Sequence, residues 1–138
     1  MSTANPIPWN SLYEAARAAL DKAYAPYSSY KVGAAIFCSD GTIVSGSNVE
    51  NASYGLALCA ERNAITTAVH QGIRHISAVV VASNDANFAT PCGACRQVIN
   101  EFGPSCLVHC INKSGQIFES SLSELLPYAF GPQNLDPS

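Results

Sequence analysis

At the centre of this 138-residue chain lies Ile76-Ser77-Ala78-Val79-Val80-Val81-Ala82, a run in which every residue but Ser77 is apolar. Side chains of a β-strand alternate between the two faces of a sheet, so a continuous apolar run indicates a strand that is covered on both faces. Residues 59–71 before it and 92–102 after it have the pattern of helices. A covered strand between two helices predicts an α/β fold, specifically a three-layer α-β-α sandwich.

Short apolar runs bounded by turn residues predict the other strands of the sheet. They lie at residues 32–38, 42–47, 107–111 and 116–118. Ser11-Leu12-Tyr13-Glu14 fits a capping box, so a first helix is expected to start at Ser11 and to stop by Pro26. Ser123 is expected to cap a short last helix that Pro127 ends. The expected order is therefore α-β-β-α-β-α-β-β-α, with a five-stranded sheet.

The length suits a single domain over residues 1–138, with loose tails at 1–8 and 132–138. Only 12% of the residues are charged and the formal net charge is −3. No cluster of Lys and Arg provides the basic surface that nucleic acid requires, so no nucleic-acid partner is expected. So small a charged fraction favours an oligomer, in which part of the surface is covered.

The N-terminal residues 1–9 contain neither the basic segment nor the apolar segment of a signal peptide. No apolar run is long enough to span a membrane. We therefore expect a cytoplasmic protein with no membrane partner, whose cysteines are reduced. Clustered cysteines in such a compartment bind metal or take part in chemistry more often than they form disulfides.

Two short motifs stand at the starts of two predicted helices: Cys59-Ala60-Glu61 and Pro91-Cys92-Gly93-Ala94-Cys95. Cys92 and Cys95 are one helical turn apart and share a face. The unpaired N–H groups and the dipole of a helix N-terminus favour the thiolate form of such cysteines. A catalytic zinc ion takes three protein ligands and lowers the pKa of a water in its fourth position. The sequence thus predicts one Zn²⁺ held by Cys59, Cys92 and Cys95, with Glu61 free to move protons.

The charge of this site needs an offset. Three thiolates and one Zn²⁺ carry a formal charge of −1, which would make the bound water less acidic. Arg62 follows Cys59 by three residues on the same helix face, and Arg96 follows Cys92 by four. Both arginines are expected to donate to the sulfurs, and Arg62 is the residue assigned to tune the charge of the zinc thiolates.

Each assignment has an alternative. Cys92 and Cys95 also fit a thioredoxin-like redox pair, which the accompanying Cys59 and Glu61 disfavour. A structural zinc site would need a fourth protein ligand, and the spacing suggests none. The remaining cysteines and the histidines are interpreted as ordinary core or surface residues: Cys38, Cys106, Cys110, His70, His75 and His109.

Longer segments around these motifs closely resemble the small cytidine deaminases that have a three-cysteine zinc site. The resemblance rests on Asn48-Val49-Glu50-Asn51-Ala52-Ser53-Tyr54-Gly55, Cys59-Ala60-Glu61-Arg62 and Pro91-Cys92-Gly93-Ala94-Cys95-Arg96-Gln97, supported by Ala25-Pro26-Tyr27-Ser28, Val32-Gly33-Ala34-Ala35, Leu125-Leu126-Pro127 and Phe130-Gly131-Pro132. It covers the chain from about Tyr24 to Pro132. It implies a mixed sheet and the hydrolytic deamination of cytidine and 2′-deoxycytidine to uridine and 2′-deoxyuridine, with release of ammonia, as in pyrimidine salvage.

The resemblance also implies how the substrate is bound. Asn48 and Glu50 would bind the ribose hydroxyls, and Tyr30 and Ala60 would contact the nucleoside. The backbone carbonyl of Thr90 would receive the exocyclic amine. The family further implies a homotetramer with shared active sites. In that assembly Phe130 would stack on the base from another subunit, and Tyr54 would contribute from a shared edge.

One departure from the family and three rival functions remain open. The family usually has Phe-Pro where this chain has Tyr30-Lys31, a change that keeps the aromatic ring but adds a hydroxyl group and loses the proline. The rivals are a deaminase of a related compound such as blasticidin S, an editing deaminase of polynucleotides, and a non-catalytic zinc-stabilised binding module. The segment from Asn48 to Tyr54 favours a nucleoside, and Glu61 favours an enzyme.

Overall fold

The structure, a computed structural model, describes residues 6–135 and contains one five-stranded sheet in the order β2-β1-β3-β4-β5. The strands are β1 (Val32–Cys38), β2 (Ile43–Ser47), β3 (Ile76–Ser83), β4 (Leu107–Ile111) and β5 (Ile117–Ser121). β3 and β4 are parallel and the other neighbours are antiparallel, so the sheet is mixed. The predicted five-stranded mixed sheet is confirmed, with the apolar run at its centre.

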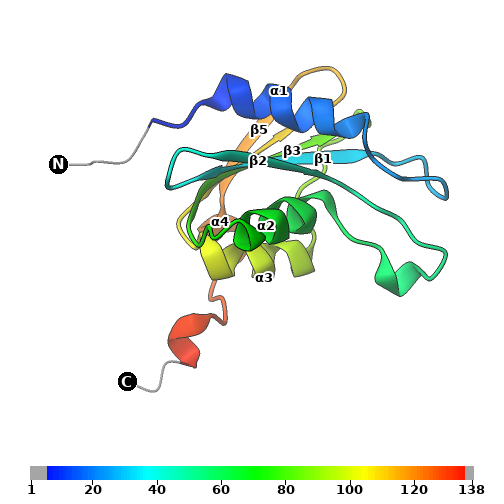
Figure 1. The fold of residues 1–138 in the computed structure, drawn as a ribbon. Helices are drawn as coiled ribbons and strands as arrows, with labels where there is room; N and C mark the ends of the chain where they lie inside the picture. Colours follow the sequence, from blue (N-terminus) through cyan, green and yellow to red (C-terminus); the bar gives the residue numbers. More distant parts are fainter. Residues whose placement is uncertain (1–5, 136–138) are drawn as a thin grey trace.

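Helices cover both faces of this sheet (Figure 1). One face carries α1 (Trp9–Leu20), and the other carries α2 (Ala60–His70) and α3 (Gly93–Phe102). The short elements are α4 (Leu122–Leu125) and two 3₁₀ helices, η1 (Tyr54–Leu56) and η2 (Pro132–Asn134). The three-layer α-β-α sandwich predicted from the sequence is therefore confirmed.

The central strand β3 contributes to two separate cores. Val79 and Val81 pack into the cluster on the side of α2 and α3, whereas Val80 and Ala82 pack into the cluster under α1. All four side chains are buried. This alternation is the physical reason for the continuous apolar run, because neither face of β3 meets water.

Close backbone approach fixes α2 against the sheet. A Cβ atom at Gly46 in β2 would lie 2.5 Å from the backbone nitrogen of Ala64 and 2.6 Å from the carbonyl oxygen of Ala60. Only glycine allows this contact. It sets the position of the N-terminal turn of α2, where Cys59 and Glu61 lie.

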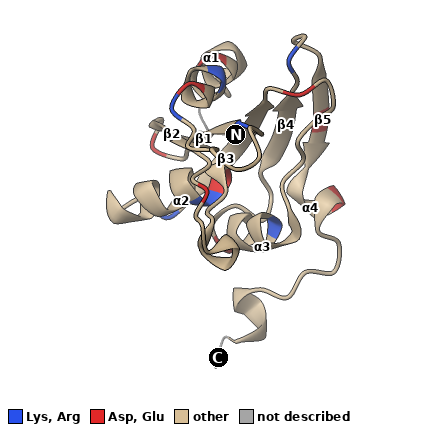
Figure 2. Cartoon of the chain, turned by 90° about the vertical axis from the view of Figure 1, so that its right-hand side faces the viewer, with Lys and Arg blue, Asp and Glu red and all other residues tan. Residues whose placement is uncertain are grey.

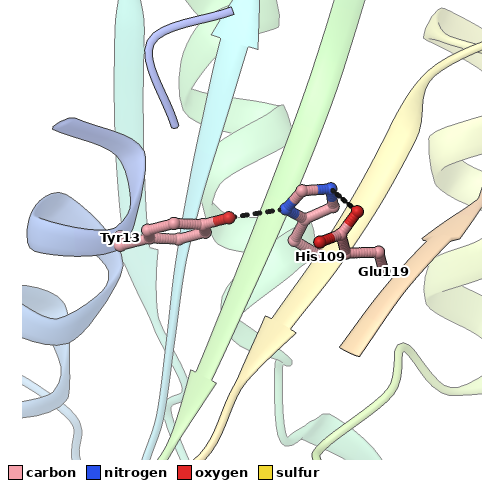
Figure 3. A network of polar contacts seen from close by, with 3 residues as sticks. All are labelled: Tyr13, His109 and Glu119. Carbon is pink, nitrogen blue, oxygen red and sulfur yellow. Dashed lines mark hydrogen bonds and ion pairs between the residues drawn. The ribbon is translucent and has the colours of Figure 1, made fainter. Parts of the chain in front are cut away.

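The predicted start of α1 is wrong. The helix begins at Trp9 rather than Ser11, and no side chain among the described residues caps it. The Trp9 ring stacks on His109 of β4 with centroids 3.5 Å apart, and the Tyr13 hydroxyl forms a 2.7 Å hydrogen bond with Nδ1 of His109 (Figure 3). These contacts fix the first turn of the helix from the sheet below it, so a local cap is not needed.

The C-terminal elements also differ in detail from the prediction. β5 extends to Ser121 because its last residue pairs with Leu107. Ser121 rather than Ser123 caps α4, and its hydroxyl accepts a hydrogen bond from the backbone N–H of Glu124. The strand and the helix therefore share one junction, whereas the sequence suggested a loop between them.

The predicted tails lie partly outside the described residues, which exclude 1–5 and 136–138. Within the described part, Ile7 packs against the core under α1 and η2 gives residues 132–134 a helical turn. No helix among the described residues is long and apolar enough to cross a membrane. Figure 2 shows the Lys and Arg residues scattered over several elements rather than gathered on one face.

Candidate active site

The N-termini of α2 and α3 bring the three predicted zinc ligands together. Cys59 is the N-cap residue of α2, Cys92 is the N-cap residue of α3, and Cys95 lies in the first turn of α3. Their Sγ atoms all lie within 4.8 Å of one another, and Cys59 Sγ is 3.9 Å from Cys92 Sγ. Two helix dipoles therefore point their positive ends at three sulfurs, which favours thiolates at this place.

This spacing fits one zinc ion. Zinc–sulfur bonds of about 2.3 Å in a tetrahedral site place the thiolate sulfurs about 3.8 Å apart. Among the described residues, no histidine, aspartate, glutamate or further cysteine joins the group. A set of three ligands is the number of a catalytic site that keeps one position for water, whereas structural sites have four.

Arg62 contacts the sulfurs and Arg96 does not. The guanidinium group of Arg62 donates a 3.3 Å hydrogen bond to Cys59 Sγ. Arg96 instead donates to the carbonyl oxygen of Pro91 at 2.7 Å and to that of Leu125 at 2.8 Å, so the expectation that it reaches the sulfurs is wrong. Its role in the structure is to hold the turn before α3 and the end of α4.

Among the three cysteines, the local electrostatics favour one thiolate over the others. A hydrogen bond from the Cys95 thiol, with further help from Arg62, lowers the pKa of Cys59 to about 5. The pKa of Cys95 is raised, because its thiol donates to Cys59 and is itself buried. The thiol nearest to Arg62 therefore carries negative charge most readily.

Glu61 is buried beside the three cysteines. It lies in the first turn of α2, and its exposed fraction is 4%. Burial raises the pKa of its carboxyl group to about 7, because an ionised carboxylate loses its hydration there. A carboxyl group whose pKa lies near neutrality both takes and releases a proton readily.

A cavity of about 410 Å³ opens over Cys59, Cys92 and Glu61. Most of the predicted substrate contacts line it: Tyr30, Asn48, Ala60 and Thr90. Sequence reasoning missed the remaining lining residues, namely Val32, Val81, Phe88 and Ala89. Val81 had a signal, since it lies near the C-terminal end of the central strand, where ligands of α/β sheets bind. Phe88 lies in a loop with no recognisable motif.

Glu50 and Tyr54 line a second cavity of about 350 Å³, together with Tyr27, Ser28, Asn51 and Ala57. The Glu50 carboxylate accepts hydrogen bonds from the backbone N–H groups of Tyr27 (2.9 Å) and Ser28 (3.2 Å) and from the Ser28 hydroxyl. The hydroxyl contact is the main reason why the pKa of Glu50 is lowered. Glu50 therefore stays ionised and fixed in place.

Asn48, two residues before Glu50, lines the first cavity instead. Its Oδ1 accepts from the Val32 N–H at 3.0 Å, and its Nδ2 donates to the Tyr30 carbonyl at 2.9 Å. An amide side chain offers two N–H groups and two lone pairs. Half of that capacity therefore remains for another partner.

Phe130 lines neither cavity in its own chain. Its carbonyl oxygen accepts a 2.8 Å hydrogen bond from Gln97 of α3, while 60% of the residue is exposed. The C-terminal segment that carries it extends away from the sheet (Figure 1). A single chain thus assembles the cysteines, Glu61 and the wall of the first cavity, but not Phe130.

Comparison with known proteins agrees with this geometry. Residues 9–111 match the family model described as "Cytidine and deoxycytidylate deaminase zinc-binding region". A cytidine deaminase of Sporosarcina psychrophila is 45% identical over 118 residues, which cover 85% of this chain and 87% of that protein. A blasticidin-S deaminase of Bacillus cereus is 29% identical over 111 residues, which cover 75% of this chain and 79% of that protein.

A solved structure supports the same relationship. The crystal structure of cytidine deaminase from Burkholderia pseudomallei superimposes with a TM-score of 0.86 at 47% identity, covering 90% of this chain and all of that one (100%). Sequence and fold therefore agree over nearly the whole chain. This chain belongs to the cytidine and deoxycytidylate deaminase family.

Proposed function

We propose that this chain is a zinc-dependent hydrolase that deaminates cytidine and 2′-deoxycytidine to uridine and 2′-deoxyuridine with release of ammonia. The observation that carries this proposal is the group of three converging cysteine sulfurs, two of which, Cys59 and Cys92, line one cavity together with the buried Glu61. The cytidine deaminase of Sporosarcina psychrophila has the higher identity, 45% against 29% for the blasticidin-S deaminase. A nucleoside substrate is thus favoured over blasticidin S.

The proton transfers fall to Glu61. When bound by Cys59, Cys92 and Cys95, zinc would supply an activated water by lowering its pKa. Glu61 takes one proton from this water and gives it to N3 of the ring. It then takes the second proton and gives it to the departing amine. The water oxygen thereby replaces the amine nitrogen at C4. One water and one cytidine are converted into one ammonia and one uridine.

Other residues orient the nucleoside. We assign the ring contacts to Tyr30 and Ala60 and the exocyclic amine to the backbone carbonyl of Thr90, all of which line the cavity of Glu61. Asn48 retains hydrogen-bonding capacity for a ribose hydroxyl. We assign the ionised Glu50, which lines the second cavity in the single chain, as the second ribose ligand. Arg62 offsets the negative charge of the thiolates through its contact with Cys59.

The assembly belongs to the proposal as well. We expect a cytoplasmic homotetramer in which Phe130 and Tyr54 complete sites of neighbouring subunits. Both residues are largely exposed in the chain, with exposed fractions of 60% and 78%. Their exposure supports contacts with another copy, since large aromatic side chains on a free surface are typical of interfaces.

Ammonia release from a panel of substrates tests the function. The purified, zinc-loaded protein is incubated with cytidine, 2′-deoxycytidine, cytosine, blasticidin S and a cytosine-containing oligonucleotide. Release from the two nucleosides, with little from cytosine, supports the proposal. Faster release from blasticidin S or from the oligonucleotide would favour the corresponding rival. A zinc-loaded protein that releases no ammonia from any substrate would indicate a binding module.

A further inference from the structure

The segment from Tyr27 to Lys31 carries Tyr30 into the wall of the cavity but forms no helix or strand of its own. Ser29 within it has a φ of 59°, in the left-handed region that non-glycine residues rarely adopt. A loop with such a conformation keeps one shape only when its surroundings hold it. The residues that hold this loop therefore decide where Tyr30 lies.

Two of these residues are already assigned to the substrate. Glu50 binds the N–H groups of Tyr27 and Ser28, and Asn48 binds the Tyr30 carbonyl. These contacts fix the start of the loop and the carbonyl side of Tyr30. The Ser29 N–H donates to the Ala25 carbonyl at 3.0 Å. These contacts leave open how the Ser29 carbonyl and the Lys31 backbone, on either side of Tyr30, are held.

Asn84 holds both of them. Its Oδ1 accepts from the Lys31 N–H at 3.0 Å, and its Nδ2 donates to the Ser29 carbonyl at 3.0 Å. Its backbone N–H donates to the Lys31 carbonyl at 3.2 Å. Asn84 directly follows β3, so one side chain ties the loop to the end of the central strand on both sides of Tyr30.

We infer that Asn84 is a positioning residue, which holds Tyr30 in the wall of the cavity and thereby sets the affinity for the nucleoside. The effect on nucleoside affinity rests on the proposed function. That Asn84 holds the loop around Tyr30 rests on the hydrogen bonds alone. The resembling family usually has a proline at the position of Lys31, and a proline there would have a fixed φ and no N–H group. Lys31 has neither constraint, and Asn84 satisfies the N–H group that a proline would lack.

The tyrosine hydroxyl provides a second observation at the same strand end. Burial raises the pKa of Tyr30, the nearby charge of Asp85 raises it further, and a hydrogen bond with Ser83 opposes these effects. Ser83 and Asp85 are the neighbours of Asn84 in the chain. The residues at the end of β3 therefore influence the pKa of the Tyr30 hydroxyl in addition to holding the backbone on both sides of Tyr30.

Three variants of the full-length, zinc-loaded protein test whether Asn84 holds the loop that carries Tyr30. Asn84→Leu removes both side-chain hydrogen bonds at similar volume, and Asn84→Asp keeps the acceptor for Lys31 but not the donor for Ser29. Asn87→Leu is the control, because Asn87 is exposed in the same loop and its side chain forms no hydrogen bond to the described residues. The measurements are KM and kcat for cytidine, zinc content, and amide hydrogen exchange of residues 27–32.

We expect Asn84→Leu to raise KM about threefold to tenfold, the range for one or two lost hydrogen bonds, while kcat and zinc content change little. Amide exchange of residues 27–32 should become faster. Asn84→Asp should lie between this variant and wild type, and Asn87→Leu should match wild type. The split between KM and kcat is the result that a purely structural role would not produce.

Two outcomes would overturn the inference. One is an Asn84→Leu protein with wild-type KM and wild-type exchange of residues 27–32. The other is a parallel loss of kcat and zinc content, which would show general damage to the site. A wild-type protein without cytidine turnover would refute the proposed function instead, and the exchange measurement would then still decide whether Asn84 clamps the loop.

Discussion

At the scale of single residues, Cys59 and Glu61 show how two neighbours on one helix turn receive different tasks. Cys59 caps α2 and points its sulfur at the cysteines of α3. Glu61 is buried beside them, but its carboxylate does not belong to the group that can hold the metal. Binding of zinc and transfer of protons are thus assigned to different side chains, and mutation should separate them.

Glu61→Gln should abolish turnover and keep the metal. The amide has nearly the same shape but transfers no proton at neutral pH, so kcat should fall by about 10²-fold to 10⁴-fold. Elemental analysis should still find about one zinc per chain, because the three thiolates are intact. Cys92→Ala is the matched variant and should lose the metal together with the activity. Near-normal turnover by Glu61→Gln would contradict the role of Glu61.

At the scale of elements, the position of α2 depends on one glycine of the neighbouring strand. Gly46→Ala should push α2 away from β2, because the new methyl group meets backbone atoms of the helix at 2.5 and 2.6 Å. Overpacking of this kind typically costs about 1–3 kcal/mol of unfolding free energy. Gly55→Ala is the control, since its Cβ would have no atom within 4 Å. Denaturant titration measures both, and equal stabilities would show that α2 adapts freely.

The docking of α1 predicts a pH dependence of stability. His109 is 7% exposed under Trp9, bonds to Tyr13, and has the Glu119 carboxylate 3.9 Å from its Nε2 (Figure 3). Burial lowers its pKa below the ordinary value of 6.5, and Glu119 only partly opposes this shift. The unfolded chain therefore binds more protons than the folded chain below pH 6.5, so the contribution of His109 is complete above that pH and is lost as the pH falls through the lowered pKa.

Unfolding free energies measured from pH 8 to pH 5 should test this dependence. The change in stability on acidification should be less unfavourable for His109→Gln than for the wild type, because the variant has no proton to bind at this position. Glu61, whose raised pKa stabilises the folded state at lower pH, contributes equally to both proteins. His75→Gln, a change at an exposed histidine, should follow the wild type. A His109→Gln protein whose pH dependence equals that of the wild type would contradict the assignment.

The same elements show what a sequence can predict. β3 was predictable because burial on both faces leaves a local signature, and the cysteine site was predictable because helix periodicity fixes the relation of Cys92 to Cys95. The start of α1 was not, because it depends on a contact between Trp9 and His109, which are far apart in the chain. The wall residue Phe88 was missed for the same reason, since only the folded chain brings it to Glu61.

At the scale of the whole molecule, the chain presents large apolar side chains beside its own site. Tyr24, Tyr27, Val49, Tyr54 and Leu56 are all exposed, near the loop that leads to α2. Only 12% of the residues are charged. A surface with these properties is typical of a protein that buries part of it in an assembly. The exposed ring of Phe130, held by the carbonyl contact with Gln97, is then available to a neighbour.

Mixing two defective proteins tests whether neighbours share their sites. Phe130→Ala should weaken substrate binding, because stacking of a base on an aromatic ring contributes about 1–3 kcal/mol. Glu61→Gln should remove the proton transfer. Suppose that each site combines Glu61 of one chain with Phe130 of another. After random exchange of equal amounts, half of the chains carry an intact Glu61 and half of their neighbours carry an intact Phe130. About a quarter of the sites should therefore be restored.

Activity of the mixture should therefore exceed the sum of the two parents after reversible dissociation, while each parent treated alone should not recover. If Phe130 acted within its own chain, every site of the mixture would keep one defect. Subunit exchange has to be established independently, by mass spectrometry of chains of different isotopic mass. Complete exchange without recovery, or a fully active monomer in light scattering, would refute the shared site, because a lone chain leaves Phe130 outside the cavity that Glu61 lines.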